Sequence, residues 1–376
     1  MKARKSKGKY VLAMLGMMCM WSQFTWTESP LAKPSAFQGS GEERHFKNIR
    51  QLTFGRKNAE AYFSFDGTKL IFQSTNNWMQ DSFAATLKTA NEGLECYQMY
   101  IMDLESETIR LVSTGSGATT CGYFFPGNRR VLYSSTHASG PNCPPKPKRD
   151  GAYRWALDDY DLYAVRIDGQ EMQRLTTTPG YDAEATISPD GKTIVWTSVK
   201  DGDLDLYAMN LDGTKVRRLT DDIGYDGGAF FSPDSKRIVY RASHPTDQTE
   251  VEKYQSLLKQ RLVEPGQLEI FVMNSDGSGR RQVTANGASN FAPYFHPDGK
   301  RIMFSSNVET RAEGERPTFH LYLVGDDGAG LERVTFDGQF NSFPMFSPDG
   351  RRLVWVSDRG AKHPGEFNVF LADWVP

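Results

Sequence analysis

The stretch EATISPDGKTIVWTSVKDGDLDLYAMNLDGTKVRRLT, residues 184–220, contains four strand-forming segments separated by turns. Its first two segments are joined by Ser188-Pro189-Asp190-Gly191, where Pro sets φ and Gly accepts a positive φ. The last two are joined by Asp212-Gly213, a strong hairpin signal. The stretch therefore predicts a four-stranded antiparallel sheet. We expect its strands at 184–188, 193–197, 204–210 and 215–220.

The same pattern recurs along most of the chain. The turn between the first two strands occurs at 64–67, 125–128, 188–191, 232–235, 296–299 and 347–350. The closing Arg-Leu-Thr-like segment is written at 50–53, 109–112, 173–176, 217–220, 281–284 and 332–335. Repeats of this length with four strands each are typical of a β-propeller. The fold class is therefore all-β, a six-bladed propeller over residues 45–376.

The two ends of the repeat array predict how the ring closes. The last repeat has three strands, of which the third is 368–374, and then the sequence stops. The segment 48–54 has the closing motif without any strand before it. We expect this N-terminal strand to complete the last blade, since that pairing hides two sheet edges.

The SPDG turns and Arg-Leu-Thr strands resemble the WD40-like repeat of the TolB propeller family, over about 330 residues. The resemblance implies a six-bladed ring and a place in the bacterial periplasm. TolB carries an α/β domain before its propeller, and the residues ahead of His45 are too few for one. Similar blades precede the hydrolase domain of prolyl-oligopeptidase-type peptidases, but no G-x-S-x-G motif is present.

The first residues predict export. Five basic residues between Lys2 and Lys9 precede an apolar run at 10–21, as in a secretory signal. We assign 1–27 to a signal peptide or N-terminal anchor and 28–44 to a linker. The alternatives are an uncleaved membrane anchor, a lipoprotein modified at Cys19 and a cytosolic protein with a basic tail. The expected location is periplasmic or secreted.

Binding sites are expected on one face of the ring. The long connections between second and third strands all fall there, and loops on a rigid scaffold usually carry binding sites. These connections are 75–97, 137–160, 244–267 and 307–318. Within 244–267, apolar residues at helical spacing from Val251 to Leu262 predict a short helix that ends before Pro265. We call this side of the ring the looped face.

Polar residues recur at the start of each innermost strand. Six residues before each first turn stand Asn58, Thr119, Asp182, Asp226, Asn290 and Asn341, and four before it stand Glu60, Cys121, Glu184, Gly228, Ala292 and Phe343. We expect these side chains to surround the mouth of the channel that runs along the propeller axis, on the looped face. Asn58, Glu60, Thr119, Asp182, Glu184, Asp226, Asn290 and Asn341 are candidate ligand-binding residues. Asp182, Glu184 and Asp226 are candidate Ca²⁺ ligands, the alternative being no cofactor and polar caps that bind channel water.

Three cysteines follow the export segment. Cys96, Cys121 and Cys143 are all expected on the looped face, in neighbouring blades. In an oxidising compartment the leading interpretation is one disulfide and one free thiol, with three free thiols as the alternative. The sequence leaves the pairing open.

Aromatic and basic residues cluster in two of the long loops. The candidates for contact with a partner are Trp78, Lys146, Lys148, Arg149 and Trp155. Aromatic side chains beside cations suit a sugar or an acidic protein, although the same aromatics also suit packing that orders the loops. A net charge of −2 argues against a nucleic-acid partner.

We therefore expect a monomeric, non-catalytic binding propeller of the cell envelope that engages a protein or glycan through the looped face. The enzymatic alternative is a metal-assisted carbohydrate lyase or hydrolase that uses the channel. That alternative requires His137 and His244 to act together beside the acidic channel residues. A third interpretation is a purely structural module.

Overall fold

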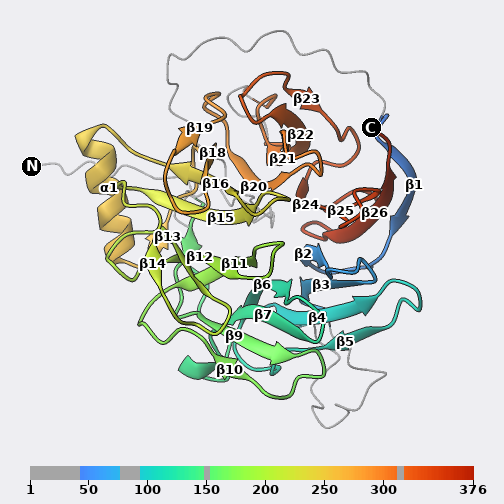
Figure 1. The fold of residues 1–376 in the computed structure, drawn as a ribbon, viewed down its shortest axis with the longest axis horizontal. Coiled ribbons are helices and arrows are strands. Elements are labelled where there is room, and N and C mark those ends of the chain that lie inside the picture. Colours follow the sequence, from blue (N-terminus) through green and yellow to red (C-terminus); the bar gives the residue numbers. More distant parts are fainter. Residues whose placement is uncertain (1–42, 77–93, 148–152, 311–316) are drawn as a thin grey trace, which may run out of the picture.

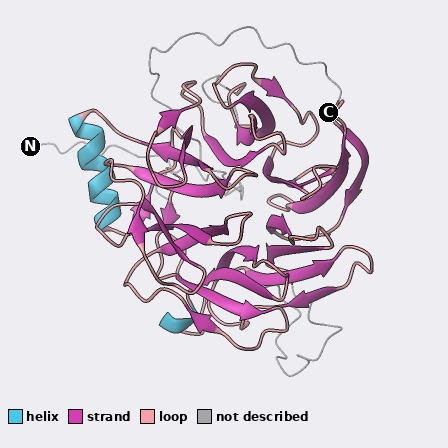
Figure 2. Ribbon diagram, viewed as in Figure 1, coloured by secondary structure: helices cyan, strands magenta, loops and turns pink. Residues whose placement is uncertain are grey.

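The computed structural model describes residues 43–76, 94–147, 153–310 and 317–376. Six four-stranded antiparallel sheets surround a central axis, and their strands dominate the ring (Figures 1 and 2). The predicted six-bladed β-propeller is confirmed. The signal segment, Trp78, Lys148 and Arg149 lie outside the described residues.

The strands occupy equivalent positions in every blade. The innermost strands are β2 (Asn58–Phe63), β6 (Thr119–Phe124), β11 (Asp182–Ile187), β15 (Tyr225–Phe231), β20 (Asn290–Phe295) and β24 (Asn341–Phe346). The second strands are β3 (Lys69–Ser74), β7 (Arg130–Ser135), β12 (Thr193–Ser198), β16 (Arg237–Ser243), β21 (Arg301–Ser306) and β25 (Arg352–Ser357).

The third strands are β4 (Gln98–Asp103), β9 (Asp161–Arg166), β13 (Asp205–Asn210), β18 (Glu269–Asn274), β22 (His320–Gly325) and β26 (Asn368–Trp374). The outer strands are β5 (Ile109–Leu111), β10 (Gln173–Arg174), β14 (Arg217–Arg218), β19 (Arg281–Gln282), β23 (Glu332–Arg333) and β1 (Phe46–Gln51).

The ring closes as predicted, with β1 paired to β26. Phe46 lies opposite Trp374, and Gln51 lies opposite Phe370. The Phe46 ring stacks on Trp355, with 4.7 Å between their centroids. Glu43 and Arg44, which the sequence assigned to the linker, form ion pairs with Arg359 and Glu332. Glu43 and Arg44 are therefore attached to the last two blades of the propeller.

The core lies between the blades. The middle residues of the second strands, such as Trp196 and Trp355, are fully buried because neighbouring sheets cover both of their faces. Backbone N–H groups at the innermost-strand starts bond to carbonyls of the preceding blade, as from Asn58 to Phe367 at 3.0 Å and from Asp226 to Leu204 at 2.9 Å. These bonds join successive blades near the looped face.

A small cap covers part of the looped face. It consists of helix α1 (Gln248–Lys259), strand β17 (Leu262–Val263) and strand β8 (Trp155–Ala156), and β17 pairs with β8 of another blade's loop. A short 3₁₀ helix (His137–Ser139) lies in the same loop as β8. The predicted helix is confirmed, although it ends before Leu262. Its N-terminus is capped by Asp247, whose carboxylate accepts from the N–H groups of Thr249 and Glu250. Among the described residues, no helix has the length and apolar character needed to cross a membrane.

Candidate functional site

An irregularity repeated in all six innermost strands builds the channel wall. Each strand shifts register against its neighbour near its start, as between Ala59 and Tyr62 in the first blade and between Gly227 and Phe230 in the fourth. The residue in each bulge has a positive φ between 50° and 59°: Glu60, Cys121, Glu184, Gly228, Ala292 and Phe343. All six line a cavity of about 30 Å³ on the axis, which has room for only a few water molecules. The expectation that these residues ring the channel is confirmed.

The polar residues two positions earlier do not line this cavity. Asn58, Thr119, Asp182, Asp226, Asn290 and Asn341 are all at most 3% exposed. The Asn58 amide donates to the Gly55 and Phe367 carbonyls at 2.9 Å, and the Asn290 amide donates to the Leu268 carbonyl at 2.9 Å. Their expected place at the channel mouth is therefore wrong. They precede the bulge, so their side chains point into the sheets and join adjacent blades.

The proposed Ca²⁺ ligands are separated for the same reason. Asp182 accepts a hydrogen bond from the Trp196 indole at 3.0 Å, and Asp226 lies 3.0 Å from His244 Nε2, whereas Glu184 faces the channel. Within the described ranges, no group of three His, Cys, Asp or Glu side chains is placed to hold a metal ion. The expected convergence of Asp182, Glu184 and Asp226 is wrong.

The two histidines of the enzymatic alternative also lie apart. His137 Nδ1 is 2.8 Å from the buried Ser135 hydroxyl, and its ring packs on Tyr163 in the second blade. His244 pairs with the fully buried Asp226 in the fourth blade. Burial lowers the pKa of His244, but the hydrogen bond and charge of Asp226 together with the charge of Asp222 outweigh it, so the pKa is raised. Each histidine is therefore held within its own blade.

An ion pair between two blades occupies the channel wall. Arg241 of β16 is 6% exposed and bonds to Glu184 of β11. The Tyr225 hydroxyl accepts from Arg241 Nε at 2.9 Å, and the Gly228 N–H donates to Glu184 at 2.8 Å. Trp155 of the cap lies over the guanidinium, which is 5.3 Å from the centre of its ring. The cap is thus attached to the channel through a buried charge.

Glu60, the second carboxyl group of the channel, forms no ion pair with any of the described residues. The Gln73 amide donates to the Glu60 carboxylate at 3.5 Å. Burial raises the pKa of Glu60 to about 7, and the Glu184 carboxylate adds to the rise. Burial also raises the pKa of the neighbouring Cys121 thiol, which is therefore kept protonated and unreactive at neutral pH.

Arg241 was missed by the sequence interpretation, although two signals point to it. Its position in the second strand is Gln, Ser, Thr, Ser or Val in the other five blades. At the equivalent of Glu60 and Glu184 the fourth blade has Gly228, where a Cβ atom would come within 2.5 Å of Arg241 Nη1. The glycine therefore leaves the space that the guanidinium fills.

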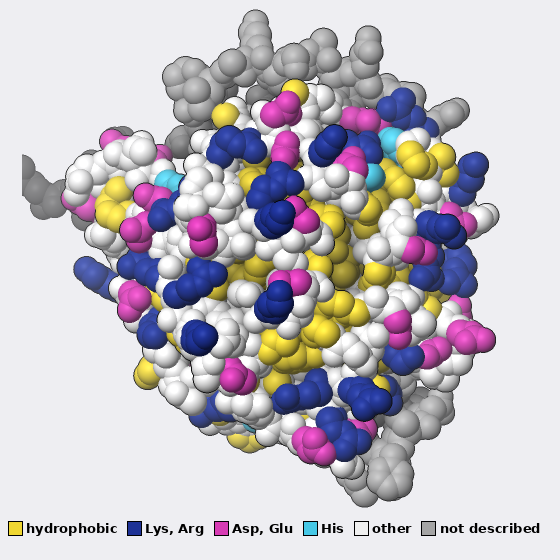
Figure 3. All heavy atoms as spheres, in the orientation of Figure 1, with side chains coloured by type: hydrophobic (Ala, Val, Ile, Leu, Met, Phe, Trp, Pro, Cys, Tyr) yellow, Lys and Arg dark blue, Asp and Glu magenta, His cyan; other side chains and the backbone are white. Residues whose placement is uncertain are grey.

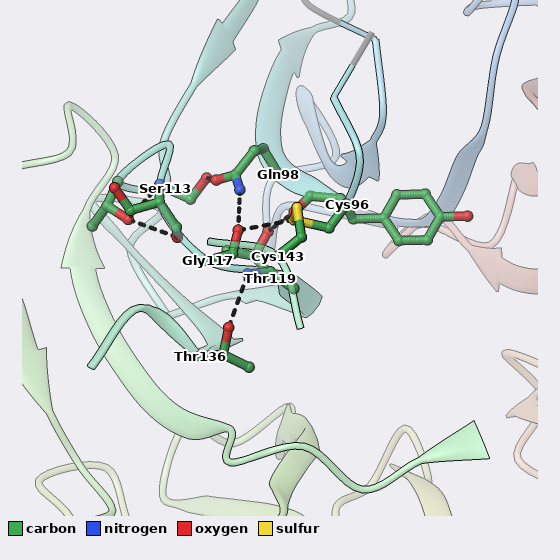
Figure 4. Close-up of a disulfide and its surroundings, with 11 residues drawn as sticks. Cys96, Gln98, Ser113, Gly117, Thr119, Thr136 and Cys143 are labelled. Atoms are coloured by element: carbon green, nitrogen blue, oxygen red, sulfur yellow. Dashed lines mark hydrogen bonds between the residues drawn. A yellow bond between two sulfur atoms is a disulfide. The ribbon is translucent and has the colours of Figure 1, made fainter. Parts of the chain in front are cut away.

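A disulfide anchors the long loops of the first two blades (Figure 4). Cys96 and Cys143 are bonded to each other, and Cys121 is a free buried thiol. Next to the disulfide, the Gln98 amide donates to the Gly117 carbonyl at 2.7 Å and the Ser113 hydroxyl donates to Gln98 at 2.8 Å. Of the predicted looped-face contact residues, Lys146 is exposed near this disulfide and Trp155 is half-buried in the cap.

One face of the molecule has mixed charge (Figure 3). On the face drawn in Figure 3, hydrophobic side chains gather around the centre, and Lys and Arg alternate with Asp and Glu around them. On this face the described residues form no extended basic stripe of the kind that nucleic acids bind (Figure 3).

Comparison with known proteins establishes the family. The model of the TolB beta propeller domain matches residues 154–263 and 255–373, which together cover more than half of the 376 residues. The chain belongs to the TolB beta propeller domain family. Two solved structures share the fold: putative TolB from Agrobacterium tumefaciens (TM-score 0.53, 19% identity, 85% of this chain and 91% of that one) and TolB from Acinetobacter baumannii (TM-score 0.54, 18% identity, 82% and 65%).

Curated relatives match over short stretches. Dipeptidyl-peptidase 5 of Porphyromonas endodontalis is 33% identical over 91 residues, which is 24% of this chain and 12% of the relative. The Tol-Pal system protein TolB of Helicobacter hepaticus is 34% identical over 93 residues, which is 24% of this chain and 21% of the relative. The chain therefore aligns with only a small part of each of these proteins.

Proposed function

We propose that the chain is a non-catalytic binding propeller of the bacterial cell envelope that engages a protein partner through its looped face. The observation that carries this proposal is the attachment of the loops to the ring at two independent points. The Cys96–Cys143 disulfide holds the loops of the first two blades, and Trp155 attaches the cap to Arg241. Loops held in one arrangement lose less entropy on binding, which favours affinity.

We propose a periplasmic location, which chemistry and the relatives support. A disulfide persists in oxidising compartments such as the periplasm. The basic and apolar start of the sequence suits export to that compartment. A relative named for the Tol-Pal system makes other components of that system the first candidate partners. We propose a monomer, because the pairing of β1 with β26 covers the edge of β26 that could otherwise pair with another chain.

A protein partner is favoured over a glycan. Trp155, the candidate for stacking on a sugar, packs on Arg241 and, edge-to-face, on Tyr225. One face of its indole is thus occupied by Arg241. The exposed residues near the disulfide, such as Lys146, suit polar contacts to a protein.

Affinity capture tests the proposal. Three immobilised proteins are incubated with solubilised envelope fraction: the wild type, a variant with residues 138–157 replaced by a short Gly-Ser linker, and Lys236→Glu. Lys236 is exposed in the first turn of the fourth blade, at the opposite end from the looped face. We expect a Tol-Pal component to be retained by the wild type and Lys236→Glu, and lost from the loop variant. Equal retention by all three folded proteins would contradict the proposal.

A further inference from the structure

A groove beside the cap has the size of a binding site. It lies between α1, the loop that carries β8 and the connections of the third blade, and its volume is about 520 Å³. Ligand pockets usually measure about 300 to 1,000 Å³. Figure 1 shows α1 at the edge of the ring, next to the third and fourth blades. We call this hollow the cap groove.

The floor of the cap groove is apolar. Leu157, Val199 and Leu258 line it, and all three belong to or pack on a small hydrophobic cluster separate from the main core. Leu157 is 4% exposed, so it is held in place by the structure beneath it. A fixed apolar floor suits one apolar side chain of a partner, which is the usual anchor of a protein interface.

The rim of the cap groove is positive. Gln255, Lys259 and Arg261 line it, and its lining includes neither Asp nor Glu. Arg261 donates to Asp159 at 2.8 Å through one nitrogen, which leaves its other donors available. In the part of the chain that the structure describes, Lys259 forms no ion pair. The charge at this rim therefore complements a carboxylate.

We infer that the cap groove docks an acidic segment of the protein partner, with an apolar side chain on the floor and an adjacent carboxylate at Lys259. This inference rests on the proposed function and specifies the kind of segment through which the protein partner binds. Electrostatic complementarity of this kind fixes register and speeds encounter. The central cavity, at about 30 Å³, has no room for such an anchor.

Selection from a phage-displayed random dodecapeptide library tests the inference without knowledge of the partner. The bait is the exported chain, and enriched peptides are synthesised and titrated by fluorescence polarisation. We expect enriched sequences to place Asp or Glu beside Leu, Ile, Phe or Trp. Lys259→Glu is expected to raise their Kd about tenfold or more, equivalent to about 1.4 kcal/mol. Gln255→Glu, at another exposed rim position, is also expected to raise the Kd of these peptides.

Lys236→Glu is the matched control, since it makes the same charge change at an exposed lysine at the opposite end of the fourth blade. Its Kd is expected to stay within about twofold of wild type. The inference is overturned by failure to enrich any peptide, by enriched peptides without acids, or by a Kd that Lys259→Glu leaves unchanged. Envelope capture that depends on 138–157 while the cap-groove variants bind normally would refute the groove and leave the proposed function intact.

Discussion

Arg241 in the second strand of the fourth blade forms an ion pair with Glu184 in the innermost strand of the third blade. The Arg241 and Glu184 side chains are 7% and 12% exposed. The pair therefore joins two blades at the channel wall and supports the tryptophan that attaches the cap.

Removal of this cation should be costly. In Arg241→Met, the Glu184 carboxylate loses its counter-charge while it stays largely buried. We expect the free energy of unfolding to fall by about 3 to 5 kcal/mol in urea titrations. The control is Arg166→Met, whose side chain is 44% exposed in its ion pair with Asp168, with an expected loss of about 1 kcal/mol or less. Equal losses of unfolding free energy in the two variants would show that the channel ion pair stabilises the protein no more than an exposed one.

Closure of the ring by β1 should control the stability of the whole propeller. Phe46 is 8% exposed and stacks on Trp355, so Phe46→Ala is expected to lower the free energy of unfolding by about 3 to 5 kcal/mol. Phe54→Ala is the control, because Phe54 is 65% exposed and its loss should cost about 0.5 kcal/mol or less. Deletion of 45–54 should abolish the cooperative thermal transition. A deletion that melts like the intact protein would refute this closure.

Glu60 should make stability depend on pH. Burial raises its folded-state pKa from 4.5 to about 7, so the folded protein binds this proton more tightly than the unfolded chain. The contribution is fully present below pH 4.5 and is lost as the pH rises to about 7. We expect urea titrations to show that Glu60→Gln gains stability relative to wild type across this window. Glu105→Gln, at an exposed position, is the control and should show the same dependence of unfolding free energy on pH as the wild type. If Glu60→Gln also shows the wild-type dependence, the pKa shift of Glu60 is absent.

The disulfide should stabilise the looped face and the ring. It closes a loop with a sequence separation of 47, for which the chain-entropy relation gives about 4 kcal/mol. We expect Cys96→Ser/Cys143→Ser to melt at a lower temperature than wild type and to be insensitive to reductant. Cys121→Ser should keep its sensitivity to reductant, because Cys121 is the free thiol. Reductant that leaves the wild-type melting temperature unchanged would contradict a structural role.

The sequence predicts the ring well because the turn and closing-strand motifs occur six times, with similar residues at the same positions each time. It predicts Glu60 and Glu184 as channel residues because both lie at the start of an innermost strand, next to the axis of the ring. It fails at Asp182 and Asp226, because a bulge with a positive φ separates the residues that face the channel from those that face the sheets. No residue type marks that bulge, which holds Glu, Cys, Gly, Ala and Phe in different blades.

Photo-crosslinking in intact cells tests whether the looped face binds an envelope protein. A photoreactive amino acid replaces Tyr153, which is 39% exposed beside the cap, or Lys236 at the opposite end of the fourth blade. We expect a discrete adduct with one envelope protein from position 153 and none from position 236. Equal labelling from both positions, or an adduct only from position 236, would contradict it.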